Sequence, residues 1–148
     1  MKEGQNEPCR IVVGVDGFEA SKAALRWAIH QANLTGATVE AVTTWQIPSG
    51  AGWAPAGEMP NYAEDAAAIL GEAIAEMATT DPEVKVRPRV IPGRAGQVLV
   101  EEADGADMLV LGTRGHSGLT EALLGSVGQY CVRHARCPVV IMHAKQEG

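Results

Sequence analysis

Five short apolar segments alternate with amphipathic helical patterns along this chain. The first segment, residues 11–15, is almost continuously apolar, which is typical of a strand buried on both faces of a parallel sheet. A turn at Asp16 and Gly17 follows, and then a helical pattern that we expect to run to about Asn33 and to stop at Gly36. Four apolar residues at helical spacing form its buried stripe: Leu25, Ala28, Ile29 and Ala32.

The middle of the chain predicts a strand, a long loop and a second helix. Residues 39–45 are rich in β-branched and aromatic types and predict the second strand. Residues 47–60 contain three prolines and three glycines and form a loop; whether Trp53 in it covers a site stays open. Asn61 and Glu64 resemble a capping box and begin a helix that reaches about residue 78. Five of its residues are predicted to face the core: Ala63, Ala67, Leu70, Ile74 and Met77.

The second half predicts two more helices and three strands. Residues 84–91 alternate between apolar and basic side chains, and Pro88 among them cannot donate a ladder hydrogen bond, so this strand lies at a sheet edge. A helix with Ala95, Val98, Leu99 and Ala103 inside then stops near Gly105. Short apolar strands follow at 108–111 and 139–142, and between them a helical pattern runs through Val127, Cys131 and Ala135.

This alternation predicts an α/β fold, a single doubly wound five-stranded parallel sheet with helices on both faces. The strand with Pro88 must be at an edge, which favours the order 3-2-1-4-5. Such sheets bind ligands beyond the carboxyl ends of the strands where the order reverses, here between the first and fourth strands. The turn at Asp16 and Gly17 and the segment after residue 111 bound that crevice.

That segment is rich in glycine and has the parts of a phosphate cradle. Gly112 and Gly115 follow a buried strand, and Gly125 precedes Ser126 and Val127 at a helix start. Glycine lets backbone approach a ligand closely, and a helix start offers free N–H groups to an anion. The segment lacks the Gly-Lys-Ser/Thr of a Walker A loop and is not a GxGxxG loop. Backbone N–H groups would therefore bind the phosphates, helped by the Ser126 hydroxyl and by Arg114. Because Gln129 completes a capping box, Ser126 also fits a plain N-cap.

Phosphate contacts alone would not give tight binding. A helix dipole contributes about 0.3–1 kcal/mol per anionic contact, whereas micromolar affinity needs about 8 kcal/mol. A pocket for a base and a sugar must supply much of the rest. Asp16, Thr43 and Thr44 are the nearest candidates, since they follow the first strand and end the second.

Composition narrows the class of protein. The chain has 148 residues, 46% of them apolar, which suits one domain at residues 9–144 between short tails at 1–8 and 145–148. A net charge of −6 gives no general reason to bind nucleic acid or a membrane surface. With no apparent leader or membrane span, we expect a cytoplasmic location. The three cysteines lack a CxxC spacing and the four histidines lack ligand spacing, so reduced thiols and no metal site are expected.

Taken together, these motifs resemble the ATP-binding subgroup of the universal stress protein family. The similarity rests on Gly112-x2-Gly115-x9-Gly125-Ser126, on the turn at Val15, Asp16 and Gly17, and on Cys137-Pro138 before the last strand. It extends over almost the whole chain and implies a nucleotide-binding HUP/Rossmann-like sheet of order 3-2-1-4-5.

The resemblance also implies a ligand, a set of binding residues and an assembly. The ligand is ATP, with Mg²⁺ bridged to its phosphates as an option, and the assembly is a homodimer. Val15, Asp16 and Gly17 would form a binding turn in which Asp16 contacts ribose or adenine. Thr44 would hold adenine through its backbone, and Leu111 would line the base. Five residues would surround the ribose and phosphates: Gly112, Gly115, Gly125, Ser126 and Val127. One departure is Phe18, where the family often has serine; it leaves the first helix cap in doubt and could narrow the site.

The last strand supports a dimer independently of the resemblance. Its residues Val139, Val140, Ile141 and Met142 would form an exposed apolar sheet edge, which proteins usually cover. Pairing with a second copy across a two-fold axis is a simple cover, and shielding by the tail is the alternative.

Three functions remain open from the sequence. The favoured one is a stress-response or regulatory module that holds ATP with little or no turnover, since no base or water-positioning group is evident. The others are a slow ATPase that uses His116 or Asp16, and a nucleotide-free dimeric interaction module. The sequence does not separate ATP from AMP or a cyclic nucleotide, and it does not identify the downstream partner or the stress signal.

Overall fold

The computed structural model describes residues 9–47, 61–113 and 124–144, and these form alternating strands and helices. The predicted tails and most of the predicted loop, including Trp53, lie outside the described residues. The elements are β1 (Arg10–Gly14), α1 (Glu19–Thr35), β2 (Thr38–Trp45), α2 (Tyr62–Met77), β3 (Val86–Pro92), α3 (Ala95–Glu102), β4 (Met108–Gly112), α4 (Ser126–His134) and β5 (Val139–Met142). None of the described helices is both long and apolar enough to cross a membrane.

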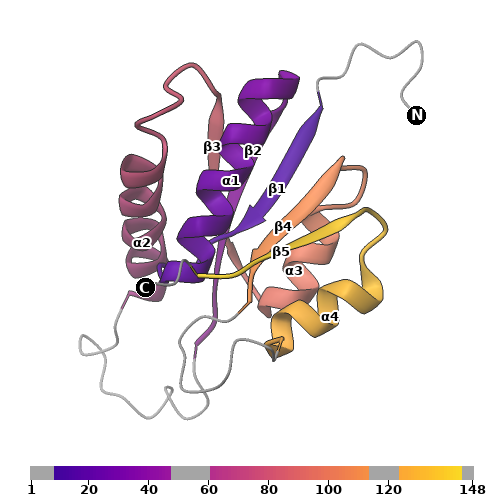
Figure 1. The fold of residues 1–148 in the computed structure, drawn as a ribbon. Helices are drawn as coiled ribbons and strands as arrows, with labels where there is room; N and C mark the ends of the chain where they lie inside the picture. The colour runs from indigo at the N-terminus through magenta and orange to yellow at the C-terminus, as the bar shows by residue number, and fades with distance from the viewer. Residues whose placement is uncertain (1–8, 48–60, 114–123, 145–148) are drawn as a thin grey trace.

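The strands form one parallel sheet in the order β3-β2-β1-β4-β5, as predicted. Figure 1 shows α1 and α2 on one face of this sheet and α3 and α4 on the other. Alternation along β1 explains the two layers. Ile11 and Val13 pack with α1 and α2, whereas Val12 packs with α3 and with Cys131 of α4. β1 is therefore buried on both faces.

The buried face of α2 differs from the prediction. Ala66, Leu70, Ala73 and Met77 are buried, whereas Ala67 is exposed. Leu70 and Met77 were predicted correctly, and the predicted Ala63 and Ile74 are only partly buried. Because alanines occur all around this helix, the apolar pattern could not determine which of them faces the sheet.

Two helix ends follow the sequence signals. Gly36 is the C-cap of α1 with φ of 81°, a left-handed conformation that glycine adopts at little cost. The Asn61 side chain caps α2 by accepting a hydrogen bond from the Glu64 N–H at 3.1 Å.

A polar network joins the elements at the amino edge of the sheet. The Arg10 guanidinium pairs with the buried Glu40 carboxylate at 3.0 Å and donates to the carbonyls of Glu102 and Asp104. The backbone N–H of Arg10 donates to the Asp107 carboxylate at 2.6 Å. One residue thus ties β1 to β2, to the end of α3 and to the start of β4.

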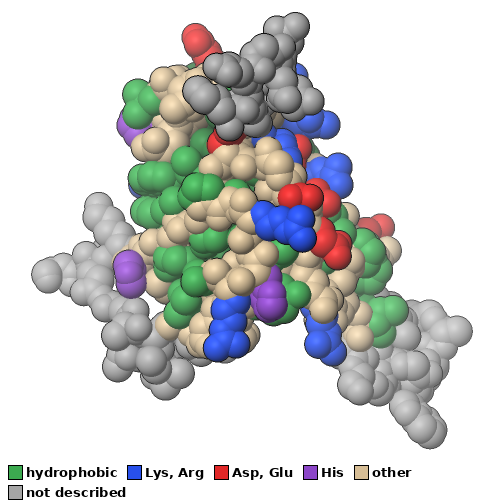
Figure 2. Space-filling model, turned by 90° about the vertical axis from the view of Figure 1, so that its right-hand side faces the viewer, with side chains coloured by type: hydrophobic (Ala, Val, Ile, Leu, Met, Phe, Trp, Pro, Cys, Tyr) green, Lys and Arg blue, Asp and Glu red, His purple; other side chains and the backbone are tan. Residues whose placement is uncertain are grey.

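β5 forms the second edge of the sheet. All four of its residues are apolar and only partly buried. Figure 2 shows the side of the molecule on which β4, β5 and α4 lie, with hydrophobic side chains over much of its middle. The carbonyls of Pro138 and Met142 accept hydrogen bonds from the N–H groups of Leu109 in β4 and of Thr113 directly after it. Because strand groups alternate in direction, the backbone groups of Val139 and Ile141 face away from the sheet.

Cys131 gives the stability of this fold a dependence on alkaline pH. Its side chain is fully buried, and burial raises the pKa of the thiol to about 11. An unfolded chain releases this proton near pH 8.5–9, so between about pH 9 and 11 the unfolded state binds fewer protons than the folded state. The free energy of unfolding should therefore fall as pH rises through this window.

We expect a loss of about 2 kcal/mol between pH 8.5 and 11 from this group. Urea unfolding of reduced protein at several pH values, beside a Cys131→Ala variant that lacks the thiol, isolates the effect. Identical pH dependence in the two proteins would contradict it.

Candidate functional site

A cleft of about 520 Å³ lies at the carboxyl edge of the sheet, between β1 and β4, where the strand order reverses. The ends of β1, β2 and β4, the starts of α2, α3 and α4, and the first turn of α1 all contribute to its walls. This is the position at which doubly wound sheets bind ligands.

The cleft brings together most of the residues predicted from the sequence. Gly17 is not among the lining residues, and Arg114 and Gly115 lie outside the described residues, as does His116. The predicted residues that line the cleft are Val15, Asp16, Thr44, Leu111, Gly112, Gly125, Ser126 and Val127.

The turn after β1 is held by a compact set of hydrogen bonds. The Asp16 carboxylate accepts from the Phe18 N–H at 3.0 Å. The Ser21 hydroxyl accepts from the Asp16 N–H and donates to the Phe18 carbonyl, both at 3.1 Å. The buried Thr43 hydroxyl donates to the Val15 carbonyl at 2.9 Å. Asp16 is thereby fixed at the cleft with its side chain exposed.

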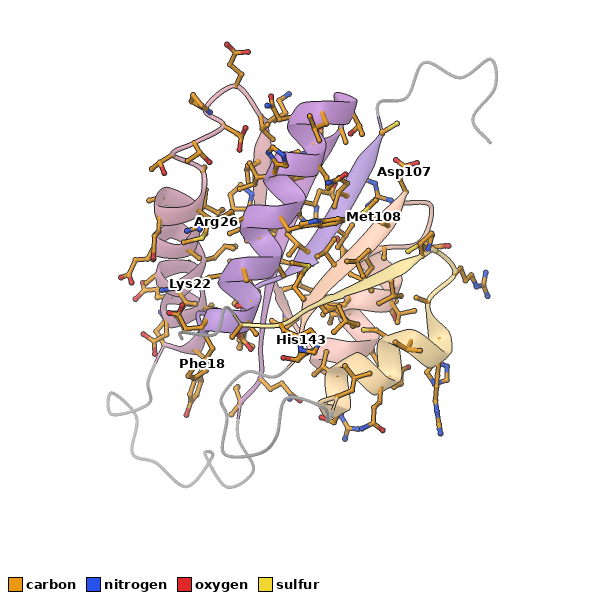
Figure 3. The ribbon with its side chains drawn as sticks, in the orientation of Figure 1. Phe18, Lys22, Arg26, Asp107, Met108 and His143 are labelled. Carbon is orange, nitrogen blue, oxygen red and sulfur yellow. The ribbon has the colours of Figure 1, made fainter. Side chains whose placement is uncertain are left out.

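Phe18 leaves the cleft open. It is the N-cap of α1 and makes no side-chain cap hydrogen bond, so the doubt about this cap was justified. The Ser21 hydroxyl, in the first turn of α1, bonds the Asp16 N–H and the Phe18 carbonyl and so does not cap the helix either. The Phe18 ring is 49% exposed, does not line the cleft, and points away from the sheet at the start of α1 (Figure 3). Its side chain therefore does not narrow the cleft as the described residues form it.

Gly112 ends β4 in close contact with the backbone of α1. A Cβ atom at this position would lie 2.6 Å from the Ala20 carbonyl carbon and 2.7 Å from the Ser21 nitrogen. The next residue, Thr113, is buried, and its carbonyl accepts from the Gly125 N–H at 3.0 Å. The chain thus leaves the sheet at Gly112 and returns at Gly125 to the same point.

The start of α4 corrects the prediction for Ser126. Gly125 is the N-cap residue and Ser126 is the first residue of the helix, without a side-chain cap hydrogen bond. The Gln129 side chain donates to the Leu124 carbonyl at 2.8 Å, so it does not close a box with Ser126. The Ser126 hydroxyl therefore lies exposed at the cleft, beside the unpaired N–H groups of the first helical turn.

Several lining residues come from helices that the sequence analysis did not connect with the site. Tyr62, Ala66 and Ile69 form one wall from a single face of α2, and Ala95 and Leu99 contribute from α3. The available signal was positional, because a helix that follows a strand of this sheet begins at the carboxyl edge. These residues are far from the glycine motif in the sequence, so the motif gave no indication that they line the same cleft.

The chemistry of the described lining is mostly apolar, with a few polar groups. Asp16 and Tyr62 are its titratable side chains among the described residues, and the described parts of the chain contain no cluster of three or more metal-ligating side chains. Such a lining can enclose a flat apolar group and offer Asp16, Thr44 and Ser126 to polar atoms around it.

Comparison with known proteins gives a consistent result. The sequence model of the universal stress protein family matches residues 9–143. A universal stress protein of Mycobacterium tuberculosis is 30% identical over 141 residues, which cover 95% of this chain and 46% of that protein. One of Methanocaldococcus jannaschii is 30% identical over 146 residues, which cover 96% of this chain and 86% of that protein. The chain thus spans about half the length of the first of these relatives.

Solved structures show the same fold. A universal stress protein crystallised in complex with cAMP has a TM-score of 0.69 and 28% identity, with 93% of this chain and 98% of that chain covered. The sequence match over residues 9–143 and the structural match therefore indicate the same family and the same fold.

Gly112→Ala tests whether this glycine serves packing or ligand approach. Because the added Cβ would meet backbone atoms of α1, we expect a loss of about 1–3 kcal/mol in the free energy of unfolding. Gly71→Ala is the matched control, since nothing lies within 4 Å of its Cβ position in α2, and it should stabilise by about 0.5–1 kcal/mol. Urea denaturation measures both. Unchanged stability of the Gly112 variant would show that the close approach is relaxed in solution.

Proposed function

The chain belongs to the universal stress protein family, and on this premise we propose that it holds an adenine nucleotide, ATP in particular, in the cleft between β1 and β4. Its role would be that of a stress-response or regulatory module with little or no turnover. The observation that carries the proposal is the convergence of an apolar cleft and the start of α4 at the position where the strand order reverses.

The cleft walls suit a base and a ribose. Val42, Leu99, Leu111 and Ile69 offer apolar surface to a flat ring from different sides. Asp16 lies at the same cleft with an exposed carboxylate, an acceptor for ribose hydroxyls or the adenine amino group. Burial of the base would supply the affinity that phosphate contacts lack.

The start of α4 suits phosphate. Ser126 and Val127 line the cleft with free backbone N–H groups, and the exposed Ser126 hydroxyl adds another donor. Mg²⁺ would enter with the phosphates, bound to their oxygens. The structural relative bound to cAMP adds support for an adenine nucleotide as the ligand.

The first test is chemical identification of the ligand. Freshly purified protein is denatured, and any released nucleotide is identified by chromatography and mass. ATP at about 100 times its dissociation constant should also add roughly 2.7 kcal/mol to the stability of nucleotide-free protein in a thermal shift assay. Absence of both signals would overturn the proposal in favour of a nucleotide-free module, and steady phosphate release would show turnover.

The variant Ile69→Glu tests whether ATP binds in this cleft. Ile69 is 40% exposed on the α2 wall, so a carboxylate there is tolerated by the fold but faces an anionic ligand. We expect ATP affinity to fall at least about tenfold, measured by calorimetry. The control is Leu34→Glu, on a 65% exposed residue of α1 outside the cleft. It should change the ATP affinity by less than about twofold relative to the wild type. Equal effects of both variants would contradict the site.

We further propose a homodimer through β5. The outward backbone groups of Val139 and Ile141 offer a pairing edge, and the apolar residues of β5 are only partly buried within one copy.

Ile141→Pro removes an outward N–H from that edge, whereas Ile141→Ala removes side-chain packing and keeps the N–H. We expect solution scattering at micromolar protein to give a dimer mass for the wild type and the alanine variant and a monomer mass for the proline variant. A monomeric wild type would defeat the dimer proposal.

A further inference from the structure

A second hollow of about 440 Å³ adjoins the cleft between the starts of α3 and α4; we refer to it as the annex. Ala95, Ser126 and Val127 line both spaces, so a ligand that lies along the start of α4 reaches from one into the other. The residues that line only the annex are Gln46, Arg94, Gly96, Gln97 and Tyr130.

The two spaces carry opposite charges. Among the described residues that line them, Asp16 is the one charged side chain of the cleft and Arg94 the one charged side chain of the annex. A polyphosphate is repelled from the first and attracted to the second. The charges of the described lining residues therefore favour one orientation of a nucleotide, with its base and ribose at Asp16 and its phosphates toward Arg94.

Arg94 is available to a ligand. It is exposed at the N-cap of α3, and its side chain makes no cap hydrogen bond. It has no ion pair with any residue in the described ranges, in contrast to Arg10, which pairs with Glu40, and Arg89, which pairs with Glu102. A guanidinium without such a carboxylate partner can bind a phosphate with two parallel hydrogen bonds.

The annex also differs from the cleft in the chemistry of its walls. Gln46, Gln97 and Tyr130 bring amide and hydroxyl donors, whereas the cleft is lined largely by aliphatic side chains. The Tyr130 ring packs against His134 with 4.3 Å between the ring centroids, which helps to hold its position on α4. The base thus has its best surroundings in the cleft, and an anion has its best surroundings in the annex.

On the basis of the proposed function, we propose that the annex receives the terminal phosphates of the nucleotide and that Arg94 selects ATP over AMP and adenosine. The base and ribose contacts are then common to all adenine ligands. One residue, at the N-cap of α3 and remote in sequence from the glycine motif, then distinguishes ligands by their number of phosphates.

The test is a comparison of four ligands on four proteins. Dissociation constants of ATP, ADP, AMP and adenosine are measured by calorimetry for nucleotide-free wild type, Arg94→Gln, Arg94→Lys and the control Arg26→Gln. Arg26 is an exposed residue of α1 that lines neither space, so its variant removes the same charge elsewhere.

We expect Arg94→Gln to weaken ATP about tenfold while AMP and adenosine change by less than about twofold. Arg94→Lys should lose less ATP affinity than Arg94→Gln, because lysine keeps the positive charge and loses only the two parallel hydrogen bonds of the guanidinium. ATP binding to Arg94→Gln should also be less sensitive to salt than binding to the wild type. Arg26→Gln should match the wild type for every ligand.

The outcomes separate the two proposals. If the wild type binds adenine ligands and Arg94→Gln keeps the same ratio of ATP to adenosine affinity, the role of Arg94 is overturned and the nucleotide site stands. Equal weakening of all four ligands would show a structural effect of the substitution and also overturn it. If the wild type binds none of the four, the proposed function fails and this inference falls with it.

Discussion

The contact between the end of β4 and the first turn of α1 is the constraint on which the cleft depends. Only a residue without a side chain fits at Gly112, because a Cβ there would overlap backbone atoms of Ala20 and Ser21. That contact brings the carboxyl ends of β1 and β4 and the start of α1 to one place. The Ser21 hydroxyl holds the turn around Asp16 with two hydrogen bonds. The Thr113 carbonyl accepts a hydrogen bond from the Gly125 N–H and so holds the start of α4 beside the end of β4. A glycine that looks like part of a phosphate motif thus also has a packing role.

Stability and ligand chemistry occupy opposite edges of the same sheet. At the amino edge, Arg10 connects β1 to Glu40 of β2, to two carbonyls at the end of α3 and to Asp107. Such a network satisfies charged groups with hydrogen bonds and holds the strand register. At the carboxyl edge, helix starts and strand ends leave backbone N–H groups and apolar surface open to a ligand. Parallel strands produce this division, because all of their carboxyl ends lie together.

The carboxyl edge of the sheet is itself divided into an apolar cleft and an annex that contains Arg94. α2 and α3 cover opposite faces of the sheet, yet both reach the cleft because each begins where a strand ends (Figure 1). Apolar residues from both helices surround the space between β1 and β4, while Arg94, just before α3, lies beyond it in the annex. A ligand with an apolar ring at one end and negative charge at the other matches this arrangement.

The sequence by itself determined the order of elements, the edge position of β3 and the general place of the site. Continuous apolar strands, helical stripes and Pro88 are local signals, and few topologies satisfy them together. It also identified Asp16, Leu111, Gly125 and Ser126 as neighbours of one crevice. It could not determine which alanines of α2 are buried, that Gly125 rather than Ser126 caps α4, or that Tyr62, Leu99 and Arg94 line the cleft and its annex. These depend on the rotation of each helix on the sheet and on contacts between residues far apart in the chain, which only the tertiary structure decides.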